Sequence, residues 1–269
     1  NQIIFDTVES NPSLETAEKI ISQFKNLDFS HVIGIGGGSS MDVAKYCAFK
    51  MNKLKIMIPT TFGSGSEVTR ISVLKVDGKK KSFHDDGIFA NIAIIDSHFI
   101  ENSDEKIIKN SVIDACAQCT EAHDSKIANP YTKFFCNSAF DLLEEGILTK
   151  NYEKIVIGSL FDGLGFGNSS TTLGHALSYV YSNEGISHGH ALSFTTTLAH
   201  KFNNSIFYNR FLNLVKLFNF ENISLIEDVN KASDLIITDR KHLDNNPIPI
   251  SKLDIINLLE IINKGKSLE

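Results

Sequence analysis

A short apolar segment that runs directly into a glycine-rich turn is the feature that most constrains the fold of this 269-residue chain. His31 to Ile35 has the character of a buried strand, Gly36 to Ser40 follows without a break, and Met41 to Met51 has helical spacing of its apolar residues. Glycines allow the backbone to approach a phosphate, and the unpaired N–H groups that begin the next helix attract it. This β–loop–α unit predicts an α/β nucleotide-binding fold, and a glycine turn without a ligand is the alternative.

The glycine-rich turn matches neither of the two common phosphate-binding motifs. Gly34-x-Gly36-x-x-Ser39 ends in serine where the dinucleotide fingerprint has glycine, and no Gly-Lys-Ser/Thr follows, as a P-loop would require. A second loop, Pro59 to Glu67, is rich in glycine and small hydroxyl residues and follows the apolar Lys55–Ile58 segment. Open α/β sheets bind ligands at the carboxyl ends of their strands, so we expect this loop to face the ligand as well.

The character of the chain changes near residue 103. Before it, strand and helix patterns alternate; the expected strands are Asn1–Phe5, His31–Ile35, Lys55–Ile58, a hairpin through Asp77-Gly78 that begins at Ile71, and Ala93–Ile95, with a Ser13-capped helix over Leu14–Phe24. After it, helical patterns dominate, over Lys106–Ala122, Pro130–Leu148, Tyr152–Leu164, Leu173–Tyr181, Ala191–Phe202, Asn209–Phe218, Ile223–Ala232 and Lys252–Asn263. We therefore expect an α/β dinucleotide-binding domain over residues 1–103 and an all-helical domain over 104–269.

The charge and apolar patterns limit the partners of this chain. The net charge is −6 and Lys and Arg form no dense block, which argues against a nucleic acid or an anionic membrane. The apolar runs are far shorter than the ~18 residues of a membrane span. No leader with a basic, apolar and small-residue pattern begins the sequence, so we expect a cytoplasmic protein. Assembly into a homodimer stays open.

Four cysteines include one C-x-x-C pair, Cys116 and Cys119. The second pair of a structural zinc site is missing, and this pair falls within a helical pattern rather than after a strand. We therefore expect buried free thiols, with a redox or ligand role as the alternative.

Three of the nine histidines, His175, His188 and His190, fall within sixteen residues. They could be loop histidines on a solvated turn, but a helix with Asp114 and Gln118 four positions apart offers further ligands on one face. A buried Asp114 costs free energy unless it is paired or capping, and a metal would remove that cost. Asp114, His175 and His188 form a two-histidine, one-carboxylate set that suits Fe²⁺ or Zn²⁺. Beside a nucleotide-binding loop, such a metal suits hydride transfer to a polarised carbonyl.

Four segments, in this order and at this spacing, resemble the iron-containing (group III) alcohol dehydrogenase family: Gly36–Lys45, Pro59–Thr69, Asp114–Glu121 and His175–Gly189. The resemblance covers nearly the whole chain. It implies a dehydroquinate synthase-like architecture, in which an α/β dinucleotide-binding domain with an incomplete Rossmann-like parallel sheet precedes an all-α metal-binding domain. It also implies Fe²⁺, with Zn²⁺ as the alternative, NAD(H) or NADP(H), and a small-molecule aldehyde or alcohol substrate.

The resemblance assigns the cofactor-binding residues to three places. The glycine-rich loop would hold the pyrophosphate, the second loop would lie along the nucleotide, and Lys80 falls near a family lysine that contacts the cofactor; the set is Gly36, Gly37, Gly38, Ser39, Ser40, Asp42, Thr60, Thr61, Ser64, Ser66 and Lys80. The family's first β-α segment, which faces the adenosine ribose, is absent from this sequence. The choice between NAD and NADP therefore cannot be read from it.

Two positions depart from the family pattern. Gln118 stands where the family usually has a histidine ligand, so the metal would have three protein ligands or take Gln118 as a weak fourth. Tyr179 stands where the family often has a histidine that serves the nicotinamide or a proton relay. We expect His190, Tyr179 or a bound water to deliver the proton.

The phosphonoacetaldehyde reductase branch of the family resembles this chain more closely. The shared features are Gln118, Thr171-Thr172 with the His175–Tyr179 run, His188-Gly-His190, and Asn245-Asn-Pro247. They imply reduction of phosphonoacetaldehyde to 2-hydroxyethylphosphonate. Ser170 stands where that branch has a lysine. Arg70 is a candidate for the missing positive charge, and a solvated or cofactor-facing Arg70 is the alternative. Another small-aldehyde or glycerol-1-phosphate-type dehydrogenase, or a truncated chain that binds nucleotide or metal without turnover, are the alternatives.

Overall fold

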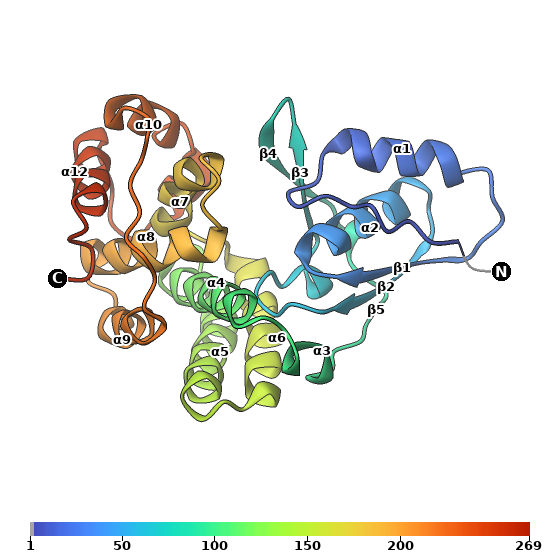
Figure 1. Ribbon diagram of the computed structural model, residues 1–269, viewed down its shortest axis with the longest axis horizontal. Coiled ribbons are helices and arrows are strands. Elements are labelled where there is room, and N and C mark those ends of the chain that lie inside the picture. The colour runs from blue at the N-terminus through green and yellow to red at the C-terminus, as the bar shows by residue number, and fades with distance from the viewer. Residues whose placement is uncertain (1–2) are drawn as a thin grey trace.

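A three-stranded parallel sheet organises the first part of the chain, which the computed structural model describes over residues 3–269 (Figure 1). The strands β1 (His31–Gly36), β2 (Leu54–Pro59) and β5 (Ile92–Ala93) lie in the order β1-β2-β5, with His31 opposite Leu54 and Gly36 opposite Pro59. The helix α2 (Gly38–Lys50) connects β1 to β2, and α1 (Leu14–Phe24) packs on α2 around Ala17, Ile20, Val43 and Cys47. The expected α/β unit is therefore present.

One face of this sheet is apolar and exposed. Ile33 and Ile35 on β1 and Ile92 on β5 are 55%, 59% and 52% exposed. Parallel sheets usually have both faces covered, and α2 covers only the other face here. The strand expected over residues 1–5 is not formed by Ile3 to Phe5, and Asn1 and Gln2 lie outside the described residues.

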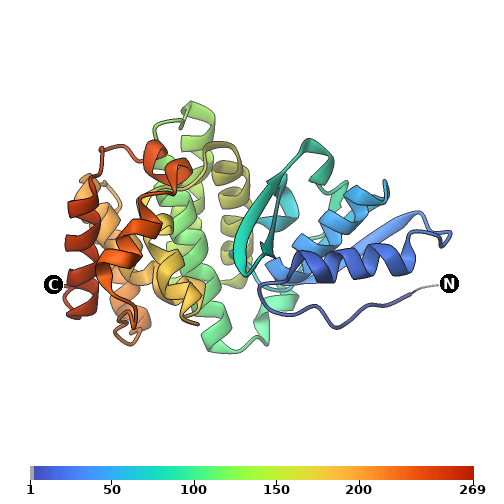
Figure 2. The ribbon, with the colours of Figure 1, turned by 90° about the horizontal axis from the view of Figure 1, so that it is seen from above.

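The predicted hairpin is confirmed. β3 (Ile71–Val76) and β4 (Lys79–His84) pair antiparallel, and Asp77 and Gly78 connect them with φ of 51° and 76°. Two positive φ values are those of a type I′ turn, which follows the natural twist of a hairpin. Figure 2 shows this hairpin between the sheet and the helices that follow. The hairpin therefore forms one wall of the space between the two parts. In the sequence, the 3₁₀ turn Ser66–Val68 precedes the hairpin and the 3₁₀ turn Asp86–Ile88 follows it.

Helices make up the rest of the chain, around a central helix, α4 (Glu105–Asp124). The side chains from Ala115 to Ala122 on α4 are buried because α5, α6 and α8 pack on its sides. The other helices are α3 (His98–Glu101), α5 (Pro130–Thr149), α6 (Tyr152–Ser169), α7 (Leu173–Asn183), α8 (His188–Asn203), α9 (Tyr208–Phe218), α10 (Val229–Ile236), α11 (Arg240–Asn245) and α12 (Lys252–Asn263). Within residues 3–269, no helix has the length and apolarity needed to cross a membrane. 

The helix expected over Ile223–Ala232 is wrong. Helix α10 begins only after Asp228, whose carboxylate accepts hydrogen bonds from the amides of Asn230 and Lys231. The segment before α10 is irregular because side chains from distant parts of the chain accept hydrogen bonds from its backbone amides. Asn263 accepts from the amide of Leu225, and Glu184 accepts from the amides of Ile226 and Glu227. Apolar spacing alone does not reveal such partners.

All four cysteines are buried and free, as expected. Burial raises the pKa of Cys47 to about 12 and the pKa values of Cys116, Cys119 and Cys136 as well. Thiols with raised pKa values are poor nucleophiles and poor metal ligands, which favours a packing role for the C-x-x-C pair.

Candidate functional site

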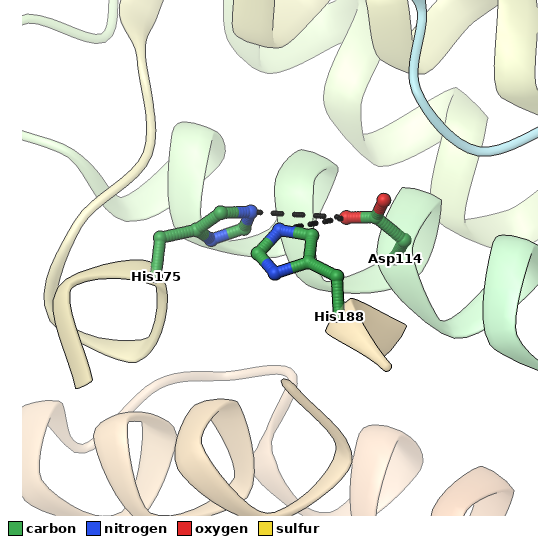
Figure 3. A group of neighbouring side chains, drawn as sticks. All are labelled: Asp114, His175 and His188. Carbon is green, nitrogen blue, oxygen red and sulfur yellow. Dashed lines mark ion pairs between the residues drawn. The ribbon is translucent and has the colours of Figure 1, made fainter. Parts of the chain in front are cut away.

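A cavity of about 550 Å³ lies between the α/β part and the helices. Its walls come from the loops after β1 and β2, from the hairpin, and from α4, α7, α8 and α11. Three side chains that the sequence singled out meet in this cavity, although they are far apart along the chain. They are Asp114 on α4, His175 on α7 and His188 at the start of α8 (Figure 3).

The three side chains present one possible ligand atom each to a common point. These atoms lie within 4.8 Å of one another. Oδ1 of Asp114 is 3.9 Å from Nε2 of His175 and 3.7 Å from Nε2 of His188. Each of these distances is longer than a hydrogen bond, and a metal ion bound to both atoms of such a pair fits between them. The arrangement fits a two-histidine, one-carboxylate metal site with positions left for a substrate.

The charges of the cluster also favour a cation. Burial raises the pKa of Asp114 to about 7, and it lowers the pKa of His188 well below its usual value, with His175 adding to that effect. Nε2 of His175 is buried and has no hydrogen-bond partner among the described residues. Buried polar atoms are normally paired, so these donor atoms fit a divalent metal such as Fe²⁺ or Zn²⁺.

Glu121, one turn of α4 beyond Gln118, holds His175 in place. Its carboxylate lies 3.2 Å from Nδ1 of His175 and accepts hydrogen bonds from Thr172 N at 2.7 Å and Thr196 Oγ1 at 3.1 Å. An ionised carboxylate can only accept hydrogen bonds, so Nδ1 of His175 carries the proton. Nε2 of His175 then keeps its lone pair for a metal. The sequence pattern missed this residue, whose signal is its i, i+7 position relative to Asp114 on the same buried helix face.

Gln118 lies beside the cluster rather than in it. Its Nε2 donates to Oδ1 of Asp114 at 3.0 Å, and its Oε1 is buried without a described partner. The amide therefore orients Asp114 in the metal-free arrangement. Its free oxygen stays a candidate fourth ligand.

The glycine-rich loop packs tightly on the second loop. A Cβ on Gly37 would lie 3.0 Å from Oγ1 of Thr61, and one on Gly38 would lie 2.9 Å from Cβ of Ser64. Gly37 is the N-cap of α2 and has no side chain, so the first amides of α2 are left for a ligand. This supports the predicted pyrophosphate position.

Only part of the predicted cofactor set lines the cavity. Gly38, Ser39, Asp42, Thr61, Ser64, Ser66 and Lys80 line it, whereas Gly36, Gly37, Ser40 and Thr60 do not. Gly36 has φ of 142° and accepts a hydrogen bond from the amide of Thr60, so these two residues join the loops behind the cavity surface. They support the loops without reaching the cavity.

Asp42 is used inside the protein. Its two carboxylate oxygens accept from Oγ of Ser66 at 2.6 Å and from the amide of Val73 at 3.1 Å. Burial raises its pKa, and Lys45, 3.8 Å away, opposes that rise. Asp42 and Ser66 therefore fasten α2 to the second loop and to β3, which is a scaffold role beside the expected cofactor contact.

Lys80 and Tyr179 both face the metal cluster from the cavity wall. Burial lowers the pKa of Lys80, and Asp114 opposes this change. The ring of Tyr179 stacks on His188 with centroids 6.2 Å apart, and burial raises its pKa. Tyr179 is therefore a neutral phenol at the position where a proton would be needed.

His190 is not in the cavity, which corrects its expected role. Two residues along a helix turn by about 200°, so His188 and His190 point to opposite sides of α8. Nε2 of His190 lies 2.6 Å from the carbonyl oxygen of Glu221, and its ring stacks on Phe220. It holds the irregular segment after α9 against α8 and does not reach the cluster.

The sequence analysis missed several residues of the cavity, among them His242, Lys241 and His84. His242 on α11 stacks on His175 with centroids 6.4 Å apart, and its Nδ1 lies 2.7 Å from Asp239. Lys241 and His84 also line the cavity. None of the three carries a motif that would predict this. Lys241 and His242 are on α11, a six-residue helix that only the tertiary fold brings to the cleft, and His84 ends β4 on the other side.

Comparisons with known proteins agree with this geometry. The model of the family described as iron-containing alcohol dehydrogenase matches residues 1–97, and that of the Fe-containing alcohol dehydrogenase family, C-terminal, matches residues 108–238. The chain is 34% identical over 209 residues to the 4-hydroxybutyrate dehydrogenase of Clostridium kluyveri, a match that covers 67% of this chain and 56% of that protein. It is 27% identical over 229 residues to the sulfoacetaldehyde reductase of Bilophila wadsworthia, covering 74% and 59%. The chain thus spans little more than half the length of these relatives.

Solved structures share the fold. The iron-containing alcohol dehydrogenase of Thermotoga maritima superposes with a TM-score of 0.85 at 24% identity, covering 97% of this chain and 83% of that one. The sulfoacetaldehyde reductase of Bifidobacterium kashiwanohense, in complex with NAD⁺, gives a TM-score of 0.88 at 23% identity, covering 97% and 84%. At these identities, the likeness establishes the architecture alone.

Proposed function

This chain belongs to the iron-containing alcohol dehydrogenase family, and we propose that it carries out metal-dependent hydride transfer between NAD(P)H and a small aldehyde. The observation that carries the proposal is the meeting of Asp114, His175 and His188 in the same cavity as the first turn of α2. One end of the cavity thus offers a metal site and another offers free helix amides. Hydride transfer to a polarised carbonyl needs both.

Each protein group has a defined task in this proposal. When bound, the metal supplies Lewis-acid chemistry and the nicotinamide supplies the hydride. Asp114, His175 and His188 hold the metal, and Glu121 keeps the lone pair of His175 directed at it. The amides at the start of α2 receive the pyrophosphate of the nucleotide.

The proton on the product oxygen comes from solvent along the cleft in this proposal. His190 is directed to Glu221 on the other side of α8 and is not available. Tyr179 stays protonated because burial raises its pKa, so its hydroxyl donates a hydrogen bond to the aldehyde oxygen but does not release its proton readily. Tyr179 therefore orients the substrate.

The favoured substrate is phosphonoacetaldehyde, with 2-hydroxyethylphosphonate as product. Gln118, Thr171-Thr172, His188-Gly-His190 and the late Asn245-Asn-Pro247 support it as a sequence pattern. The names of two relatives, 4-hydroxybutyrate dehydrogenase and sulfoacetaldehyde reductase, also describe small molecules with an aldehyde or alcohol at one end and an anion at the other. Fe²⁺ is the favoured metal because of the family.

The test is a set of assays on protein prepared without oxygen and loaded with either Fe²⁺ or Zn²⁺. Oxidation of NADH and of NADPH is followed with phosphonoacetaldehyde, sulfoacetaldehyde, succinic semialdehyde, butyraldehyde and dihydroxyacetone phosphate. We expect metal-dependent turnover that is fastest with phosphonoacetaldehyde. Turnover of dihydroxyacetone phosphate alone would assign the glycerol-1-phosphate-type reaction, and nucleotide binding without any turnover would contradict the enzymatic proposal.

A further inference from the structure

Two basic side chains lie against each other at the opening of the cavity, one from each part of the molecule. Nζ of Lys241 on α11 is 3.1 Å from Nε2 of His84 at the end of β4. Both residues are exposed, and both line the cavity that holds the metal cluster. They are thus in contact across the cleft and open to a ligand that enters it.

Within the described part of the chain, neither Lys241 nor His84 has a carboxylate within ion-pair distance. The nearest acids along the chain are used elsewhere, since Asp239 pairs with His242 at 2.7 Å and Asp244 with Arg240. Among residues 3–269, no carboxylate oxygen lies within 4.0 Å of Nζ of Lys241, whereas Arg70, which also lines the cavity, pairs with Asp86 at 3.0 Å. An ammonium group has three hydrogens, and His84 takes one of them, so two remain for a ligand.

The protonation state of His84 agrees with this arrangement. Burial lowers its pKa, and the charges of Lys241 and Arg70 lower it further. His84 is therefore neutral near pH 7 and accepts the hydrogen bond from Lys241. The contact fixes the direction of the Lys241 side chain, which would otherwise be mobile on the surface, toward the cleft.

Lys241 is on the side of the cleft that carries the candidate metal ligands. Lys241 precedes His242, whose ring stacks on the candidate ligand His175 at 6.4 Å between centroids. Asn245, at the other end of α11, donates to the carbonyl oxygens of Ser169 and Thr171, which ties this helix to the segment that leads into α7. The glycine-rich loop that would bind the nucleotide lies in the α/β part, on α2.

We propose that Lys241, held by His84, binds the terminal oxyanion of a small aldehyde or alcohol whose other end reacts at Asp114, His175 and His188. This proposal rests on the proposed function, which it deepens by naming the substrate class: a short chain with a phosphonate, sulfonate or carboxylate at the end opposite the reacting carbon. The unpaired ammonium supplies the charge, and its position on α11 next to His242 places that charge beside the metal cluster.

The test measures binding first, so that it does not depend on turnover. Metal-loaded wild type is titrated calorimetrically with 2-hydroxyethylphosphonate, isethionate and 4-hydroxybutyrate. We compare Lys241→Gln, Lys241→Arg and the matched surface control Lys133→Gln, which lies on α5 away from the cleft. Losing a hydrogen bond to a charged group weakens binding by about 10- to 100-fold, so we expect that loss in Lys241→Gln for the tightest anion. Lys241→Arg and Lys133→Gln are expected to stay within about threefold of wild type.

Three outcomes would overturn the proposal. In the first, Lys241→Gln binds all three anions as wild type does. In the second, wild type binds none of them. In the third, Lys241→Gln loses affinity for NADPH but not for NADH, since the pair would then bind the 2′-phosphate of the nucleotide.

Kinetics separate this proposal from the function on which it rests. In Lys241→Gln, kcat/KM for phosphonoacetaldehyde should fall at least tenfold through KM, while kcat/KM for the uncharged butyraldehyde stays within twofold. If wild type reduces no aldehyde but binds an anion through Lys241, the proposed function fails and the anion site stands. If wild type reduces aldehydes and Lys241→Gln treats both substrates alike, the anion site fails and the function stands.

Discussion

The carboxylate of Glu121 lies 3.2 Å from Nδ1 of His175 and joins α4 to α7, two of the three helices that carry the candidate metal ligands. Burial alone would raise the pKa of Glu121, but the His175 ring and the amide of Thr172 hold it at about 2, so the group stays charged. A charged acceptor fixes both the ring orientation and the tautomer of His175. The candidate metal ligand His175 is therefore oriented by a residue that does not line the cavity.

Glu121→Gln should weaken metal binding while the fold is kept. The glutamine amide lacks the negative charge of Glu121. Its N–H groups would also face the donor groups of Thr172, His175 and Thr196, which need an acceptor. We expect affinity for Zn²⁺ or Fe²⁺ to fall by about 10- to 100-fold, measured by competition with a chelator. Glu144→Gln, which removes a carboxylate that pairs with Arg210 away from the cavity, is the control and should leave the affinity unchanged. Equal affinities in the two variants would show that Glu121 has only a packing role.

His175→Ala and His190→Gln should differ sharply. His175→Ala removes a ligand, so we expect loss of the bound metal and a fall of at least about 10³-fold in reductase activity. His190→Gln should keep both metal content and activity within a fewfold, because His190 contacts the carbonyl of Glu221 outside the cavity. Metal analysis and steady-state kinetics on the same preparations decide this. An active, metal-free His175→Ala protein would contradict the proposed mechanism.

Gln118→His should strengthen metal binding. Gln118 already lies 3.0 Å from Asp114, and its Oε1 has no described partner, so the position is close enough to supply a fourth ligand. Imidazole binds Fe²⁺ and Zn²⁺ better than an amide oxygen does. We expect at least a tenfold gain in affinity in the chelator competition, and none for Gln118→Leu. A gain in metal affinity in Gln118→Leu would show instead that removal of the buried amide, rather than a new ligand, strengthens binding.

Gly38→Ala should impair nucleotide binding. The added Cβ would lie 2.9 Å from Cβ of Ser64, so one of the two loops must shift where the helix amides face the cavity. We expect NADH affinity, followed by its fluorescence, to fall by tenfold or more with little change in metal content. Gly78→Ala, at the hairpin tip where a Cβ meets nothing within 4 Å, is the comparison; its φ of 76° makes it strained, so it controls for general loss of stability. Similar NADH affinities in the two variants would place the nucleotide elsewhere.

Asp162 should make the protein less stable as pH rises. It is fully buried, both its oxygens are without described partners, and burial raises its pKa well above the usual value, with Asp114 and Glu67 adding to the rise. Because the folded-state pKa exceeds the unfolded value of ~3.9, the contribution to stability is complete below about pH 4. It is then lost as pH rises toward the folded-state pKa, by up to ~1.4 kcal/mol per pH unit.

Asp162→Asn removes this titration without changing the shape of the side chain. The free energy of unfolding of the variant minus that of wild type should therefore increase steadily between about pH 5 and pH 8 in urea titrations. A difference that does not depend on pH would show that Asp162 keeps a normal pKa in the folded protein.

The parts of the fold that local patterns control were predictable. Helix α1 begins after its Ser13 cap and spans Leu14–Phe24 as expected, because a cap and an apolar stripe act within a few residues. The Asp77-Gly78 turn was predictable for the same reason, since two positive φ values need such residues. The irregular segment after Phe220 was not predictable, because its backbone amides donate hydrogen bonds to the side chains of Asn263 on α12 and Glu184 at the end of α7.

The sequence by itself indicated two features of this protein: a glycine-rich turn before a helix, and Asp114, His175 and His188 as candidate metal ligands, both from residue types and spacing. Tertiary structure alone decided which side chains share the cavity. Helix geometry turned His190 away from His188, packing placed Glu121 behind His175, and it brought Lys241, His242 and His84 to the site from segments without a motif. The physical reason is that spacing along the chain reports neighbours within one helix or strand, whereas contacts between elements depend on how buried surfaces fit together.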